Sequence, residues 1–189
     1  MKRQFIKFIL FFSIILPANA AFQFDLGFNY FSEDDENTSL TFDKFDYRGF
    51  FAAGLGQKGK LFFGQFISKY GREFTNSGTT GVFDVLELGP KFQYYFSEMR
   101  TLYFSLNWNP YVRGEKTLSG TTSNLSGSSY IIGFGYHLKI SRAFCLGASI
   151  SYHTVAISKE TNTSTNVETE VSKSYTAIYP MIEMSFRFR

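Results

Sequence analysis

Apolar and polar residues alternate along most of this chain with a period of two. Between Phe22 and Tyr30 every second residue is aromatic or leucine, and polar or small residues stand between them. This period is typical of β-strands, in which successive side chains point to opposite faces of a sheet. The same alternation recurs and predicts eight strands, over residues 22–30, 45–56, 61–70, 82–96, 102–113, 130–140, 144–153 and 177–188.

The clearest pair of predicted strands is the segment Val82–Arg113, in which two long alternating arms are joined by a short polar turn. Soluble strands have about 5 to 6 residues, whereas a tilted strand needs about 9 to 11 residues to cross a membrane. The length of both arms therefore predicts strands that span a bilayer. Pro90, Pro110 and Pro180 each remove a backbone donor, so bulges or strand ends are expected near them.

The connections between the predicted strands alternate in length. Those near residues 57, 97 and 141 are short, and those near 35, 75, 120 and 165 read as long loops rich in acidic residues or in Gly, Ser, Thr and Asn. An even number of strands with alternating short turns and long loops is typical of bacterial outer-membrane barrels. The sequence thus predicts an all-β fold, an eight-stranded antiparallel up-and-down transmembrane β-barrel, with both termini periplasmic.

The composition of the polar face separates this prediction from a soluble barrel of the lipocalin type, which shows the same alternation. That face consists mainly of Gly, Ser, Asn, Ala and Tyr with few charges, which suits a narrow interior better than contact with water. The apolar face then contacts lipid, and a girdle of aromatic residues is expected at its margins. The predicted girdle comprises Tyr30, Tyr47, Tyr94, Trp108, Tyr130 and Tyr152.

The first twenty residues have a different character. A basic start, an apolar run and the sequence Ala18-Asn19-Ala20 predict a cleaved signal peptide over 1–20, followed by one barrel domain over 21–189. Removing the three basic residues of the signal peptide leaves 16 basic and 16 acidic residues, so no nucleic-acid partner is expected. The lone Cys145 excludes an internal disulfide.

Charged residues on the predicted inner face are expected to pair, because an eight-stranded barrel is narrow and isolated buried ions are costly. Two ionic clusters are predicted, with Asp25 meeting Arg187 where the first and last strands join. Together the clusters would plug the lumen; a gated polar path is the alternative. Their members are Arg48, Glu87 and Arg113 at one level, and Asp25, Lys91, Lys139, Glu183 and Arg187 at the other.

Other candidate chemistry is sparse. Ser149, Ser151 and His153 share one face and raise the alternative of a lipid hydrolase, but their expected place in the lumen favours a structural role and no catalytic residue is predicted. The acidic run Glu33, Asp34, Asp35 and Glu36 offers oxygen ligands for a cation that bridges to lipopolysaccharide. It lacks the spacing of a dedicated calcium loop, so neither a metal site nor a cofactor is expected.

The segment LELGPKFQYYF and the terminal alternation Ile182, Met184, Phe186 and Phe188 resemble the small outer-membrane β-barrels, such as the transmembrane domain of OmpA and OmpX. Members usually end on an aromatic residue, whereas Arg189 follows Phe188 here. The resemblance implies outer-membrane lipid, lipopolysaccharide and the barrel-assembly machinery as partners. Two functions remain open: a surface-interaction barrel with an unknown extracellular partner, or a narrow pore or transporter for small or apolar solutes.

Overall fold

The computed structural model describes residues 21–35, 40–55, 59–76 and 79–188, and the predicted signal peptide lies outside these ranges. It confirms the predicted fold class: all eight strands form one closed antiparallel barrel. The strands are β1 (Phe22–Asp35), β2 (Leu40–Leu55), β3 (Leu61–Asn76), β4 (Thr79–Tyr95), β5 (Leu102–Leu118), β6 (Thr121–Lys139), β7 (Phe144–Asn162) and β8 (Glu168–Phe188).

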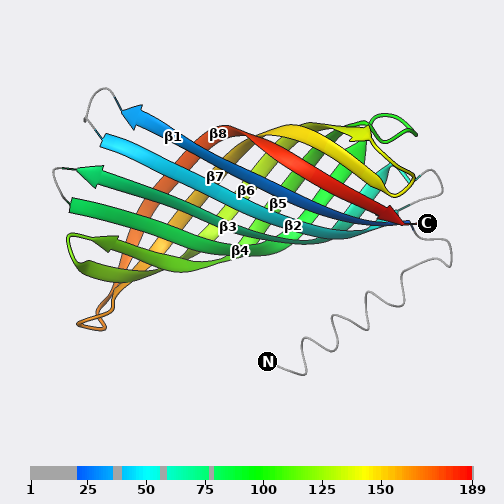
Figure 1. Cartoon of the computed structure of the whole chain (residues 1–189). Helices are drawn as coiled ribbons and strands as arrows, with labels where there is room; N and C mark the ends of the chain where they lie inside the picture. Colours follow the sequence, from blue (N-terminus) through cyan, green and yellow to red (C-terminus); the bar gives the residue numbers. More distant parts are fainter. Residues whose placement is uncertain (1–20, 36–39, 56–58, 77–78, 189) are drawn as a thin grey trace, which may run out of the picture.

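Each strand pairs with the next one in the sequence, and β8 pairs with β1 to close the ring. Phe22 pairs with Phe188, so β1 begins and β8 ends at the same end of the barrel (Figure 1). We call this the termini end, and the opposite end the hairpin end. Among the described residues, no helix has the length and hydrophobicity needed to cross a membrane.

The alternation of the sequence becomes an alternation between the lumen and the outer face. Tyr95 is fully buried in the lumen, whereas the neighbouring Tyr94 leaves 43% of its surface exposed on the outside. The large exposed apolar side chains, such as Phe92, Leu106 and Ile150, occupy the outward positions of their strands. The outer face of the barrel is therefore apolar and aromatic.

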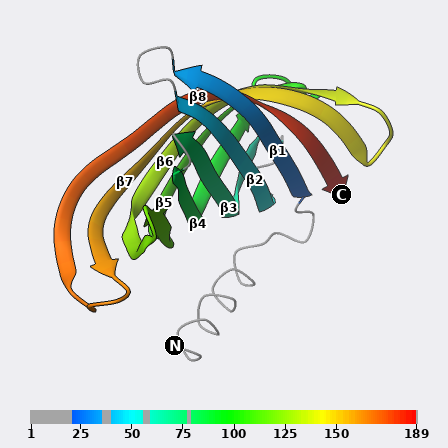
Figure 2. The ribbon, with the colours of Figure 1, turned by 60° about the vertical axis from the view of Figure 1, so that its left-hand side comes forward.

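The strands are longer than predicted, and this corrects the expected long loops. The Gly/Ser/Thr-rich stretch after Arg113 belongs largely to β5 and β6, which are separated only by Ser119 and Gly120. The alternation disappears there because both faces are polar, but backbone pairing continues. Most of the expected loops are instead hairpins that prolong the barrel wall, as Figure 2 shows for β7 and β8.

A bulge in β5 corrects the predicted position of Arg113. Leu88 pairs with Tyr111 and Lys91 with Asn107, so two residues of β4 oppose three of β5, among them Pro110. The pairing of β5 with β6 also shifts between Asn109 and Val112. Beyond the bulge the two faces exchange: Val112 is 1% exposed in the lumen, and Arg113 lies outside. The missing donor of Pro110 explains why the ladder breaks at this point.

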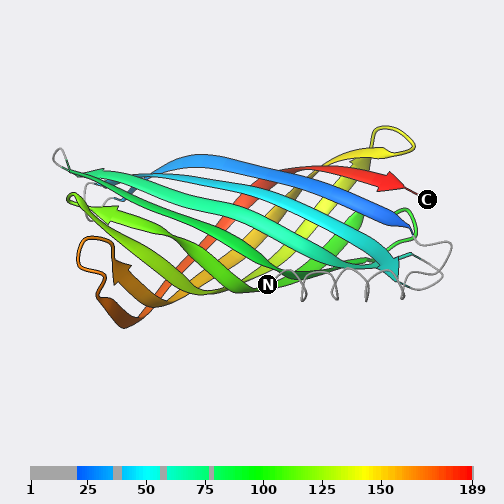
Figure 3. The same cartoon turned by 90° about the horizontal axis from the view of Figure 1, so that it is seen from below.

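The contact between β1 and β8 is much shorter than the other strand contacts. It contains seven register pairs, from Phe22 with Phe188 to Phe28 with Ile182, whereas β1 and β2 pair over fourteen. Beyond Phe28 the two strands diverge toward the hairpin end (Figures 1 and 3). Pro180 lies just past the last pair and still pairs in register with Ile150 of β7. We call the β1–β8 contact the seam.

Candidate functional site

Two networks of buried polar side chains cross the lumen. The one nearer the hairpin end, the upper network, takes residues from seven of the eight strands. Its members share burial and hydrogen bonds across the lumen, and they are Asp46, Arg48, Ser68, Glu87, Asn109, Ser129, Ser151, His153 and Tyr179.

Glu87 of β4 is the acceptor at one side of the upper network. Its carboxylate accepts hydrogen bonds from Asn109 Nδ2 at 3.1 Å and Ser129 Oγ at 2.9 Å, and it contacts His153 Nε2 at 2.9 Å. Because His153 is on β7, this contact runs between strands that are not neighbours. The carboxylate is thus held by β5, β6 and β7 together.

Asp46 of β2 is the second acceptor. Arg48 Nη2 lies 2.7 Å from its carboxylate, and the Tyr179 hydroxyl of β8 donates to the same oxygen. His153 Nδ1 lies 2.8 Å from the Tyr179 hydroxyl and so links the two carboxylates.

The lower network is organised around Glu183 of β8. Ser149 Oγ donates to this carboxylate at 2.8 Å, Tyr103 donates to it as well, and His137 Nε2 lies 3.1 Å away. Gly135 makes room for this arrangement, because a Cβ at that position would lie 2.4 Å from the Tyr103 hydroxyl. The contacts join β5, β6 and β7 to β8 within the lumen.

The predicted pair of Asp25 and Arg187 is wrong. Asp25 instead accepts hydrogen bonds from the amides of Gln23, at 2.6 Å, and Gln93, at 3.3 Å. Arg187 donates to His137 Nδ1 at 2.9 Å and to the Arg100 carbonyl at 2.8 Å. Neutral amides thus solvate the carboxylate where sequence reasoning had placed a cation.

The other predicted lumen charges have different environments. Arg48, Glu87 and Glu183 are held in the networks, and Lys91 is buried in the lumen with its ammonium group 4.6 Å from the Phe50 ring centre. Lys139 is exposed at the termini end. Sequence reasoning missed Asp46, although its position two residues before Arg48 places it on the same inward face.

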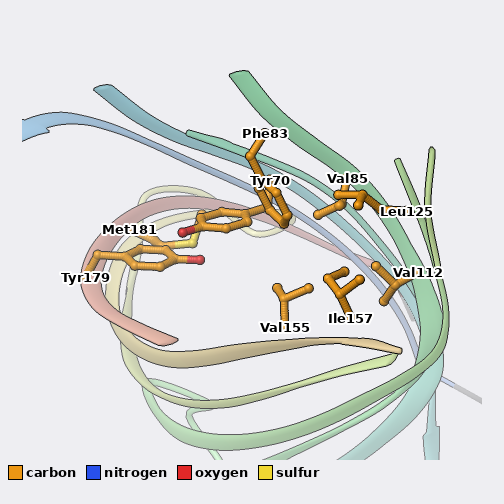
Figure 4. Packing of buried hydrophobic residues seen from close by; sticks show 9 residues of the cluster. All are labelled: Tyr70, Phe83, Val85, Val112, Leu125, Val155, Ile157, Tyr179 and Met181. Carbon is orange, nitrogen blue, oxygen red and sulfur yellow. The ribbon is translucent and has the colours of Figure 1, made fainter. Parts of the chain in front are cut away.

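Apolar side chains fill the lumen around the polar networks. Toward the hairpin end, a cluster of nine buried residues includes Tyr70, Val155, Tyr179 and Met181 (Figure 4). Its aromatic members also contact the upper network, since the Tyr70 ring lies 4.8 Å from the ring of His153. The lumen is therefore filled by side chains at several levels, and its hairpin end is apolar.

The serines considered for hydrolysis contact other groups than a histidine base. Ser149 donates to Glu183, and Ser151 Oγ accepts a hydrogen bond from Arg48 Nη1 at 2.8 Å. His153 itself is buried between Glu87 and Tyr179. These contacts hold the serines and histidines as structural members of the networks.

The six residues of the predicted aromatic girdle all face outward and are exposed: Tyr30, Tyr47, Tyr94, Trp108, Tyr130 and Tyr152. The side chains of Glu33, Asp34 and Asp35 and the whole of Glu36 lie outside the described residues. Among the residues that are described, no group of three or more His, Cys, Asp or Glu could hold a metal ion.

Ion pairs link β7 and β8 at the outermost part of their hairpin. Lys159 Nζ lies 2.6 Å from Glu168, and Lys173 Nζ lies 2.9 Å from Glu160. Each hydrogen bond favours the charged ammonium form and raises the pKa of its lysine. The tip of this hairpin is therefore polar and charged, unlike the outer wall below it.

No protein-family model matches the sequence, and no curated protein matches it either. Among solved structures, the chain is similar to the neisserial surface protein A (NspA), with a TM-score of 0.51 and 16% identity over 89% of this chain and 95% of NspA. The β domain of the Bordetella autotransporter BrkA aligns with a TM-score of 0.38 and 10% identity, over 90% of this chain and 98% of that one. The likeness to NspA supports the barrel fold.

Proposed function

We propose that this protein is a bacterial outer-membrane β-barrel whose lumen is plugged by two side-chain networks and which acts at the cell surface through its hairpins. The apolar outer face and its exposed aromatic residues support insertion into lipid. The same features favour a place among the small barrels that resemble OmpA and OmpX. In this orientation the termini end faces the periplasm.

The contacts that cross the lumen are the main support for the proposal that the lumen is plugged. Glu87 on β4 contacts His153 on β7, and Asp46 on β2 accepts from Tyr179 on β8. Neither pair of strands is adjacent, so these contacts cross the space that a pore would need. Opening the lumen would break these contacts and leave buried carboxylates without their donors, which is costly.

Conductance in planar bilayers tests the plug. The refolded protein should insert without a steady large conductance, since ions cannot pass two buried networks. A double variant, Glu87→Ala with His153→Ala, should conduct more often than wild type, whereas the outward Leu86→Ala variant should not. Steady conductance of the wild-type protein would refute the plug and favour the pore.

In this proposal the surface-facing parts are hairpins of continuous strand, such as β5–β6 and β7–β8. Loops and tips on a rigid scaffold are frequent sites of binding. Lipopolysaccharide and an extracellular partner are the proposed contacts of these tips, with the run Glu33–Glu36 as a proposed cation bridge. The barrel-assembly machinery is the proposed partner during insertion.

A second candidate, passage of small apolar solutes, is favoured by one observation. The apolar cluster at the hairpin end lies against Phe31 of β1 and Ala177 of β8, in the part where the seam is unpaired. An apolar solute could reach the cluster from lipid there.

Brominated solutes test this candidate, because they quench tryptophan fluorescence at short range. With Trp108 replaced by phenylalanine, a single tryptophan at Phe31 reports on the unpaired part of the seam and one at Phe66 on the closed wall. Bromododecane should quench the tryptophan at position 31 as strongly as it quenches Trp108 in the wild-type protein. It should leave the fluorescence of the tryptophan at position 66 unchanged. Equal protection of both would exclude entry through the seam.

A further inference from the structure

The termini end contains a pocket that neither the plug nor the surface hairpins explain. Its volume is about 490 Å³, within the range of roughly 300–1,000 Å³ of small-molecule sites. The turn between β4 and β5, the turn between β6 and β7, and the end of β8 all contribute to its wall. We call it the basic pocket.

Positive charge is concentrated in this pocket. Its charged lining consists of the cations Arg100, Lys139, Arg142 and Arg187 and one acid, Glu98. Residues 21–189 contain equal numbers of acidic and basic side chains, so this excess is local. Cations that are distant in sequence meet here because the fold brings two turns and the last strand together.

Arg187 is held in place by groups that do not neutralise its positive charge. Its Nη2 donates to the Arg100 carbonyl, to His137 Nδ1 and, at 3.2 Å, to the Tyr95 hydroxyl. None of these acceptors is a carboxylate. His137 Nδ1 accepts from Arg187, and the other ring nitrogen, Nε2, faces Glu183.

Arg100 is positioned by an unusual backbone. Its φ of 56° lies in the left-handed region, which non-glycine residues adopt at a cost. Its guanidinium stacks 5.0 Å from the Phe62 ring centre, and a Cβ at Gly59 would lie 2.3 Å from its Nη2. The glycine thus leaves space for a fixed guanidinium beside the pocket.

We infer that the basic pocket binds a phosphate group, as a free phosphate or as the headgroup of an anionic phospholipid. Two fixed guanidinium groups suit phosphate oxygens, since arginine presents a planar fork of donors. Lys139 and Arg142 are exposed and add mobile positive charge. The pocket itself does not depend on the proposed membrane location; only the lipid source rests on it.

Titration of the full refolded chain in non-ionic detergent with inorganic phosphate tests the pocket alone. Calorimetry should show saturable binding that weakens as NaCl rises. The variant Lys139→Ala with Arg142→Ala should weaken binding at least tenfold. The matched control, Arg113→Ala with Lys116→Ala, removes two cations elsewhere in the barrel and should leave affinity unchanged.

A second arm distinguishes the two sources of phosphate. The protein is reconstituted in phosphatidylglycerol and phosphatidylcholine, extracted, and examined by native mass spectrometry. Retention of phosphatidylglycerol by wild type, lost in the Lys139/Arg142 variant, assigns the pocket to lipid. Phosphate binding without such retention assigns it to a soluble anion.

The inference is overturned if neither phosphate nor phosphatidylglycerol binds, or if both double variants reduce binding equally. Failure of the chain to insert into vesicles would instead count against the proposed membrane location. The detergent titration would still report on the pocket in that case.

Discussion

At the scale of residues, the lumen shows how buried charges are tolerated in a narrow barrel. Glu87 is fully buried, and its carboxylate has partners on three other strands. Asp25 is treated differently, because amides from Gln23 and Gln93 solvate it. Buried carboxylates here are held by whichever donors the strands around the lumen supply, and not by cations alone; in Asp25 only Oδ2 accepts, and the buried Oδ1 has no hydrogen-bond partner.

Replacing Glu87 by alanine should destabilise the barrel by about 3–5 kcal/mol, because His153, Asn109 and Ser129 lose a common acceptor. Asp84→Ala removes a half-exposed partner of Lys69 and should cost at most about 1 kcal/mol. Urea unfolding in lipid vesicles measures both. Similar losses in the two variants would contradict the upper network.

At the scale of elements, β5 shows the effect of one inserted residue. Before Pro110 the odd-numbered residues face the lumen, and after it Val112 does so. A strand has a period of two, so one extra residue exchanges the faces of everything beyond it. The outer face of β5 is therefore apolar only up to Pro110.

Cysteine labelling should detect this exchange of faces. In detergent, a maleimide should modify Arg113→Cys rapidly and Val112→Cys only after unfolding, because the first side chain lies outside and the second in the lumen. Asn109→Cys, before the bulge, is the matched buried control. Rapid labelling at 112 with protection at 113 would show that the strand continues without a bulge.

Hydrogen exchange should identify the unpaired part of the seam. Amides of residues 29–31 and 176–179 that point toward the seam have no strand partner there, so they should exchange at least a hundredfold faster than those of residues 66–70 in the fully paired β3. Mass spectrometry of peptides from liposome-embedded protein measures this. Uniform protection around the barrel would refute the divergence of β1 and β8.

The sequence was sufficient to predict the barrel, because alternation at Phe22–Tyr30 or Phe92–Tyr95 directly reports a sheet with one apolar face. It could not place Arg113, since Pro110 indicated that a bulge was expected but not which residue was extra. It also could not pair Asp25 correctly, because partners across the lumen depend on stagger between distant strands. The loops were misjudged where both faces of a strand are polar.

At the scale of the whole molecule, the outer face of the barrel is apolar around its middle, and exposed polar residues lie in the turns at both ends. The turn at Ser119 and Gly120 lies at the hairpin end, and the turn at Ser141 lies at the termini end. Both serines are exposed. The proposed orientation places the first outside the cell and the second in the periplasm.

Labelling of intact cells tests this orientation. In a Gram-negative host, a bulky impermeant maleimide should modify Ser119→Cys on whole cells and Ser141→Cys only after the outer membrane is broken. The pair controls for expression, since each variant carries one new exposed cysteine in a turn. The opposite pattern would reverse the proposed orientation.

The short seam also has a consequence for how the barrel folds. Closing the ring joins residues that are almost a full chain length apart, such as Phe22 and Phe188. The strand pairing that closure adds contains only seven register pairs. Contacts between distant residues form slowly, because the chain loses loop-closure entropy before the new contacts stabilise it. The hairpins of neighbouring strands should therefore assemble first, and the meeting of β1 with β8 should set the rate at which the closed ring appears.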